Sequence, residues 1–224
     1  MSREYLKQSI IPVGSLDANF GIFVEDFSFA KQGAKAGTGT DYEVSLDPTG
    51  ALRGSCGLKL QTKTTTPADN DYVSYTQIFG VVLSQFMEFL VFVKFPSIAS
   101  NFTFDFVVSV PSGADVHGLQ FGAQIILSSL AIKVLTGSAT FTAVDTISQL
   151  AANDWNILQV GIDRINQKYV TLRWNHEDFD PSANSVHDEG AVDNTMDFTP
   201  KLTVNAATQR ACYIDNILIR SELS

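Results

Sequence analysis

Apolar and polar residues alternate with a period of two over many short stretches, and this pattern constrains the fold more than any other feature. In residues 102–110 every second side chain is Phe or Val. Such alternation places the apolar side chains on one face of a β-strand. Turn residues such as those at 47–50 separate the stretches. The pattern predicts an all-β protein with minimal helix, built as a double-sheet sandwich or a barrel.

The expected strands run through most of the chain, and 31–40 is expected to form a glycine-rich loop. The strands are 42–46, 57–63, 72–79, 86–95, 102–110, 119–127, 131–135, 138–144, 156–162, 169–175 and 212–219. A short helix is expected only at 146–152, and a parallel α/β fold would need crossover helices that the sequence lacks. No repeat or long linker divides the chain, so we predict a single domain at 20–224. Residues 1–19 form either an N-terminal arm or an edge strand of the same sheet.

The charge balance excludes two classes of partner. The chain has 24 acidic and 15 basic residues, a formal net charge of −9. Such a charge repels nucleic-acid phosphates and anionic membrane surfaces, so we predict no nucleic-acid and no membrane partner. The first residues contain no apolar stretch long enough for a signal peptide. We therefore expect synthesis in the cytoplasm without ordinary export, and association with the virion if the protein is viral.

The chain has two cysteines, Cys56 and Cys212. Two cysteines do not form the framework of a disulfide-rich protein, so free buried thiols are expected. A disulfide between the two strands that carry them is the alternative.

Three segments together resemble the jelly-roll sandwiches of the concanavalin A-like lectin and glucanase superfamily, including laminin G-like and carbohydrate-binding modules. They are 54–60, with small residues before an alternating run, 154–163 with 169–175 after it, and the closing stretch 212–219. The resemblance implies a two-sheet antiparallel jelly-roll β-sandwich. The superfamily contains lectins, hydrolases, adhesion modules and virion proteins, so this fold does not decide the function.

The glycoside hydrolases of this superfamily carry paired carboxylates in a Glu-x-Asp-x-Glu or Glu-x-Asp-x-x-Glu run. Retaining hydrolysis needs two carboxyl groups about 5 Å apart, and alternate residues on one strand supply them. This chain has no such run, and it also lacks the common nucleophile, zinc and phosphate motifs. We therefore predict that the protein is not an enzyme.

An acidic segment at 176–197 contains no Lys or Arg. Closely spaced carboxylates repel one another unless solvent or a cation neutralises them. Oxygen ligands from Asp and Asn suit calcium, and the mixture resembles the calcium loop of legume-type lectins in composition though not in order. Asp178, Asp180, Asn184 and Asp188 are the candidate ligands, and a solvated acidic loop is the alternative. No other cofactor is expected.

Exposed aromatic rings are candidates for sugar binding, because a ring face stacks on the apolar face of a pyranose. Trp155 lies at the start of an expected strand, and Tyr72 and Tyr75 lie in another. Trp174 alternates with Val170 and Leu172 and is expected in the core.

Three hypotheses for the function follow. The first is a non-catalytic binding or assembly protein, most specifically a bacteriophage structural or capsid-decoration protein, whose partners are copies of itself or a capsid protein. The alternative is a carbohydrate-binding module or lectin with a glycan ligand, dependent on calcium or not. The third is a glycoside hydrolase with an unusual site.

Overall fold

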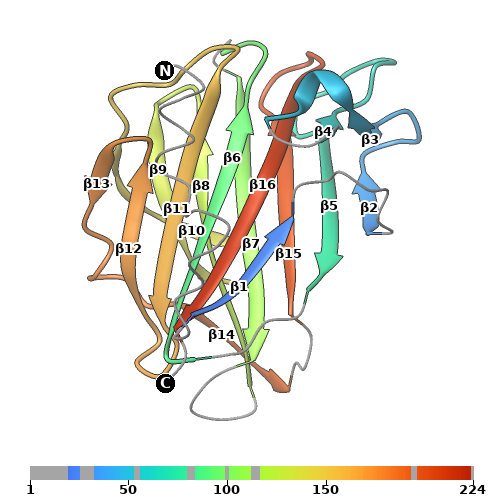
Figure 1. Ribbon diagram of the computed structural model, residues 1–224. Helices are drawn as coiled ribbons and strands as arrows, with labels where there is room; N and C mark the ends of the chain where they lie inside the picture. Colours follow the sequence, from blue (N-terminus) through green and yellow to red (C-terminus); the bar gives the residue numbers. More distant parts are fainter. Residues whose placement is uncertain are drawn as a thin grey trace.

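Two antiparallel sheets pack face to face in the computed structural model of the chain, and the prediction of an all-β jelly-roll sandwich is confirmed (Figure 1). The structure describes residues 20–25, 33–52, 56–79, 84–98, 101–111, 117–192 and 196–222. Residues 1–19, predicted as an arm or an edge strand, lie outside these residues.

Sheet A contains both the first and the last strand of the described chain. Its order is β13 (Glu177–Phe179), β12 (Lys168–Trp174), β11 (Trp155–Asp163), β6 (Phe86–Lys94), β16 (Ala211–Glu222), β4 (Gly57–Gln61) and β3 (Glu43–Asp47), and β1 (Phe20–Glu25) also pairs with β16. A short 3₁₀ helix at Pro48–Gly50 connects β3 to the next segment.

Sheet B packs behind it. Its order is β10 (Thr140–Thr146), β9 (Ala131–Gly137), β8 (His117–Ile126), β7 (Phe102–Pro111), β15 (Asp197–Val204), β5 (Tyr72–Ile78) and β2 (Ala34–Gly37), and β14 (His187–Val192) also pairs with β8. Within the described residues, no helix is long and apolar enough to cross a membrane.

Phenylalanine rings from the two sheets fill the core between them. Phe89 of sheet A packs against Phe106 and Phe121 of sheet B, with ring centroids 4.6 and 5.7 Å apart. All three rings are completely buried. Alternation along each strand directs them inward, and burying such large apolar surfaces is the main force that holds the sheets together.

Tyr169 ties the two sheets together by a buried hydroxyl. It lies on β12, and its Oη donates to the carbonyl of Leu135 on β9 (2.7 Å) and accepts from the N–H of Gly122 on β8 (3.1 Å). The pairing of β8 with β9 ends at Ala123, so the tyrosine satisfies backbone groups where the ladder stops. Burial raises the pKa of Tyr169.

Strand β15 was not predicted, although it lies in the middle of sheet B between β7 and β5. It contains Pro200, which cannot donate a ladder hydrogen bond and usually argues against a central strand. Its pairing with β5 skips Thr199 and Pro200, so the missing N–H is accommodated there. The predicted loop at 31–40 likewise contains a strand, β2.

The predicted helix at 146–152 is wrong. Thr146 ends β10, and the following residues form an irregular loop. Alternation also fails at Val170, which is 49% exposed while Trp174 is in the core as expected. A bulge causes this, because Gly161 pairs with Thr171 and Ile162 with Tyr169, which leaves Val170 unpaired with β11.

Both cysteines are free, so no disulfide joins them. Cys212 pairs with Leu60 on β4, whereas Cys56 lies four residues before Leu60, about 13 Å away along the strand direction. A disulfide requires Cα atoms within about 7 Å. Burial raises the pKa of the Cys212 thiol.

Tyr169→Phe is expected to destabilise the fold by about 2 kcal/mol, because it leaves two buried backbone groups without their partner. Urea unfolding followed by tryptophan fluorescence measures the change. Tyr213→Phe, on the outer face of sheet A, is the control and should change the free energy of unfolding by less than about 0.5 kcal/mol. Equal effects of the two substitutions would contradict the bridging role of the Tyr169 hydroxyl.

Candidate functional site

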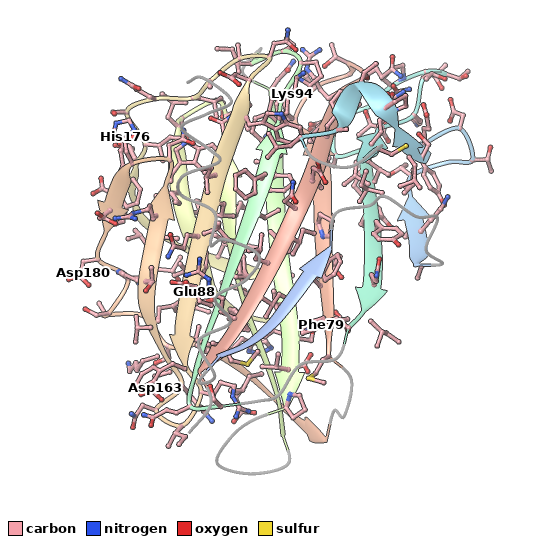
Figure 2. The ribbon with its side chains drawn as sticks, in the orientation of Figure 1. Phe79, Glu88, Lys94, Asp163, His176 and Asp180 are labelled. Carbon is pink, nitrogen blue, oxygen red and sulfur yellow. The ribbon has the colours of Figure 1, made fainter. Side chains whose placement is uncertain are left out.

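A depression of about 470 Å³ lies at the end of sheet A where β11 begins and β12 ends. We call it the Trp155 groove. Figure 2 shows His176 at this end of the sandwich. The lining residues are Ser148, Gln149, Leu150, Ala151, Asp154, Trp155, Asn175 and His176.

The completely buried side chain of Asn156 organises the loop on one side of the groove. Its Oδ1 accepts from the N–H of Ala151 (2.9 Å), and its Nδ2 donates to the carbonyls of Ala151 (3.0 Å) and Asp154 (3.4 Å). These contacts satisfy backbone groups of Ala151 and Asp154 in the loop that precedes β11. The amide therefore supports this loop where no helix forms.

The turn after β12 forms the other side. Asn175 adopts a left-handed backbone conformation (φ 54°), and its Nδ2 donates to Asn156 Oδ1 (3.1 Å). Its own Oδ1 accepts from the N–H of Ile157 (2.8 Å). Asparagine tolerates this conformation better than most residues. The two sides of the groove are thus joined through a pair of asparagine amides.

Glu177 and Trp174 add three further connections between the sides. The Glu177 carboxylate accepts from the N–H groups of Ser148 (2.8 Å) and Gln149 (3.3 Å). The Trp174 indole donates to the carbonyl of Gln149 (3.0 Å). A groove held by this many hydrogen bonds needs little reorganisation when a ligand binds.

Trp155 is half-buried and supplies the aromatic wall. It packs against an apolar cluster on the outer face of sheet A that includes Phe92 and Leu218. Exposed Asp154 and His176 and the half-buried Asn175 lie beside it in the groove lining. An aromatic face next to a carboxylate, an amide and an imidazole suits a ligand with an apolar face and several hydroxyl groups.

Of the three aromatic residues predicted to bind sugar, only Trp155 lies in this groove. Tyr72 is half-buried on the outer face of sheet B, with Lys201 Nζ 5.0 Å from its ring centroid. Tyr75 points into the core, where it is 3% exposed and its hydroxyl donates to Gln77 (2.8 Å). Burial makes the Tyr75 ring unavailable to a ligand.

Trp155 is the one lining residue that the sequence predicted as a sugar contact, and Asp154, Asn175 and His176 are among those that it did not. Asn175 ends an expected strand, which is a weak signal for a turn. Their proximity to Trp155 depends on the register of the β11–β12 hairpin, including its bulge.

The four candidate calcium ligands do not assemble into one site. Asp178 lies on β13 in sheet A, and its carboxylate pairs with Arg173 (2.6 and 2.9 Å), which lowers its pKa. Asp188 lies on β14, which belongs to sheet B. The segment predicted to be one loop is therefore divided between two sheets (Figure 1).

The remaining two candidates stabilise the turn between those strands. Asp180 accepts from the N–H of Ser182 (3.0 Å), and hydrogen bonds from Ser182 lower its pKa. Asn184 donates through its side chain to the carbonyl of Pro181 (3.3 Å). Across the described part of the chain, no three His, Cys, Asp or Glu side chains form a group that could hold a metal ion.

Asp105 is a buried acid on the outer face of sheet B, only 8% exposed. Gln124 donates to its Oδ1 (2.9 Å), and Lys201 is its cross-strand partner on β15. Burial raises the pKa of Asp105, although Gln124 and Lys201 oppose the shift.

Asn156→Ala is expected to lower the free energy of unfolding by about 2 kcal/mol, because it leaves buried backbone groups of the loop without partners. Thermal and urea unfolding measure the loss. Asn166→Ala, at an exposed asparagine in the β11–β12 turn, is the matched control and should lower the free energy of unfolding by less. A loss no larger than that of the control would contradict the supporting role of Asn156.

Asp105→Asn is expected to stabilise the protein at neutral pH. A raised pKa means that the folded state binds the proton more tightly than the unfolded state, so stability falls as pH rises from the ordinary pKa of 3.8 through the raised value. The gain from the substitution should therefore shrink to nothing in acid. Melting temperatures from pH 3 to pH 8 test this, with Asp145→Asn on β10 as the charge control. A pH-independent loss of stability would contradict it.

No protein-family model and no curated protein matches this chain. Solved structures do match its fold. A glycoside hydrolase family 16 endo-glucanase from Bacteroides ovatus has a TM-score of 0.55 at 12% identity, over 88% of this chain and 99% of the other. A β-glucanase from Bacillus licheniformis has a TM-score of 0.54 at 11% identity, over 90% and 98%. A carbohydrate esterase from Shiga toxin-encoding bacteriophage phi24B has a TM-score of 0.50 at 18% identity, over 84% and 90%.

These comparisons contradict the prediction that the protein is not an enzyme. Two glycoside hydrolases and a carbohydrate esterase are built on the same sandwich. The missing Glu-x-Asp-x-Glu run excludes one arrangement of carboxylates, and it does not exclude catalysis on this fold. At these identities the likeness establishes the fold, and it confirms the resemblance to the concanavalin A-like jelly rolls.

Proposed function

We propose that the protein binds carbohydrate through the Trp155 groove. The observation that carries this proposal is the half-buried indole of Trp155 beside the polar side chains of Asp154, Asn175 and His176. A sugar has an apolar face that stacks on an aromatic ring and hydroxyl groups that both donate and accept hydrogen bonds. The groove offers both kinds of contact.

The hydrogen-bonded frame of the groove supports the same conclusion. Sugars are strongly hydrated, so a binding site gains little unless its own groups are already positioned. Here Asn156 and Asn175 hold the two sides of the groove together. The fold also supports the proposal, because glucanases and a carbohydrate esterase share it.

A setting on a bacteriophage particle, with copies of this chain or a capsid protein as partners, stays a prediction. One of the similar structures comes from a bacteriophage. Glycan binding would be compatible with that setting, and the oligomeric state measured by light scattering would test the prediction of self-association.

Trp155→Ala is expected to weaken glycan binding at least about ten-fold, since buried aromatic anchors carry much of the energy of an interface. Isothermal titration calorimetry against a panel of polysaccharides, beginning with β-glucans, measures the affinity. Phe141→Ala, a half-buried aromatic on β10 of the other sheet, is the control and should bind as the wild type does.

The same titrations are repeated with calcium and with a chelator, and the mixtures are assayed for released reducing ends, because hydrolases share the fold. Wild-type protein that binds none of the panel, or Trp155→Ala protein that binds as tightly as the wild type, would contradict the proposal.

A further inference from the structure

A second groove, of about 190 Å³, lies on the outer face of sheet A between β6, β11, β12 and β16. We call it the Glu88 groove. Its lining residues are Phe86, Met87, Glu88, Gly161, Val170, Thr171 and Arg220.

A fixed carboxylate and guanidinium form the polar part of this groove. Glu88 accepts from Gln159 Nε2 at one oxygen (2.7 Å) and from Arg220 Nη1 at the other (3.2 Å). The Nε of Arg220 is buried and has no hydrogen-bond partner among the described residues. A hydroxyl group that enters beside this pair finds an acceptor in Glu88 and donors in Arg220.

Apolar side chains flank these polar groups. Phe86 is 40% exposed and Val170 is 49% exposed, both unusual for large apolar residues in this chain. Val170 is turned outward by the bulge in β12. Gly161 presents no side chain, and a Cβ there would lie 3.2 Å from the Thr171 side chain. The groove thus combines an apolar rim with polar groups, as the Trp155 groove does.

The two grooves lie on one face along the same strand. Trp155 and Gly161 share the outer face of β11 by alternation, and they pair with Lys94 and Glu88 of β6. Figure 2 shows Lys94 at one end of β6 and Glu88 further along that strand. Six residues of extended chain separate the grooves by about 20 Å.

The surface between the grooves is partly exposed, and the two arginines along it are ion-paired. Ile157, Gln159 and Arg173 occupy it, and all three are partly exposed. Arg173 is paired with Asp178, and Arg220 is paired with Glu88. Because both arginines are ion-paired with carboxylates, neither of them favours an anionic ligand at this surface.

We propose that the two grooves are ends of one binding surface, and that its ligand is a neutral, linear polysaccharide lying along β11 and β12. This inference rests on the proposed function, since it extends the Trp155 groove. A single sugar fills only the Trp155 groove, whereas a longer chain also reaches Glu88 and Arg220.

Calorimetry with neutral oligosaccharides of increasing length, cut from the polysaccharide that the wild type binds best, tests the proposal. The affinity of the wild type should rise with length until both grooves are filled. Glu88→Gln should leave the affinity for a disaccharide unchanged and lower the affinity for the longest oligosaccharide at least about ten-fold. Phe86→Ala should act in the same way.

Glu43→Gln is the matched control, because Glu43 is also ion-paired on sheet A, with Lys59 (2.8 Å), and lies in the lining of neither groove. It should leave the affinity unchanged at every length, and circular dichroism checks that each variant is folded. Affinity that does not depend on length, or a loss in Glu88→Gln that is equal at all lengths, overturns the extended surface. If Trp155→Ala still abolishes binding in that case, the Trp155 groove stands as the site. Wild-type binding by Trp155→Ala overturns both proposals.

Discussion

The burial of two apolar sheet faces against each other is the constraint on which the rest of the structure depends. Phe89, Phe106 and Phe121 pack across the middle of the sandwich and leave no room there for polar side chains or a ligand. Because every second residue of a strand is used in this way, only the outward-facing positions and the loops at strand ends remain for function. The Trp155 groove and the Glu88 groove lie at such positions.

Two polar side chains that are buried despite this constraint, Tyr169 and Asn156, make several hydrogen bonds each. The Tyr169 hydroxyl satisfies backbone groups where β8 and β9 separate, and the Asn156 amide does the same for the loop beside Trp155. Unpaired polar groups at these depths would be costly, so each amide or hydroxyl has a defined geometry. The same hydrogen bonds that satisfy the loop before β11 therefore also shape the Trp155 groove. Stability and site geometry are linked through one asparagine.

The alternation of residues predicted most strands well, and the failures have physical causes. The strand β15 was not predicted because it contains Pro200. A proline in a central strand is tolerated only where the hydrogen-bond ladder to a neighbouring strand is interrupted, as it is here. A bulge placed Val170 outside and so upset the simple two-residue period. The acidic segment 176–197 was predicted to be one loop. Its two halves pair with different sheets, and this separates Asp178 from Asp188. Tyr75 and Trp155 looked alike as candidate sugar platforms, and only burial distinguishes them.

The sequence by itself determined the all-β class, the apolar faces of the strands, the acidic surface charge and the position of Trp155 at the start of a strand, because these follow from local alternation and composition. Only the tertiary structure decided that Asn175 and His176 meet the loop before Trp155, and that Glu88, Gly161 and Arg220 line one groove. Glu88, Gly161 and Arg220 come from strands far apart in the chain, and Asn175 and His176 follow the strand that pairs with β11. Their proximity follows from pairing and register, which result from the packing of the whole sandwich and not from any local stretch.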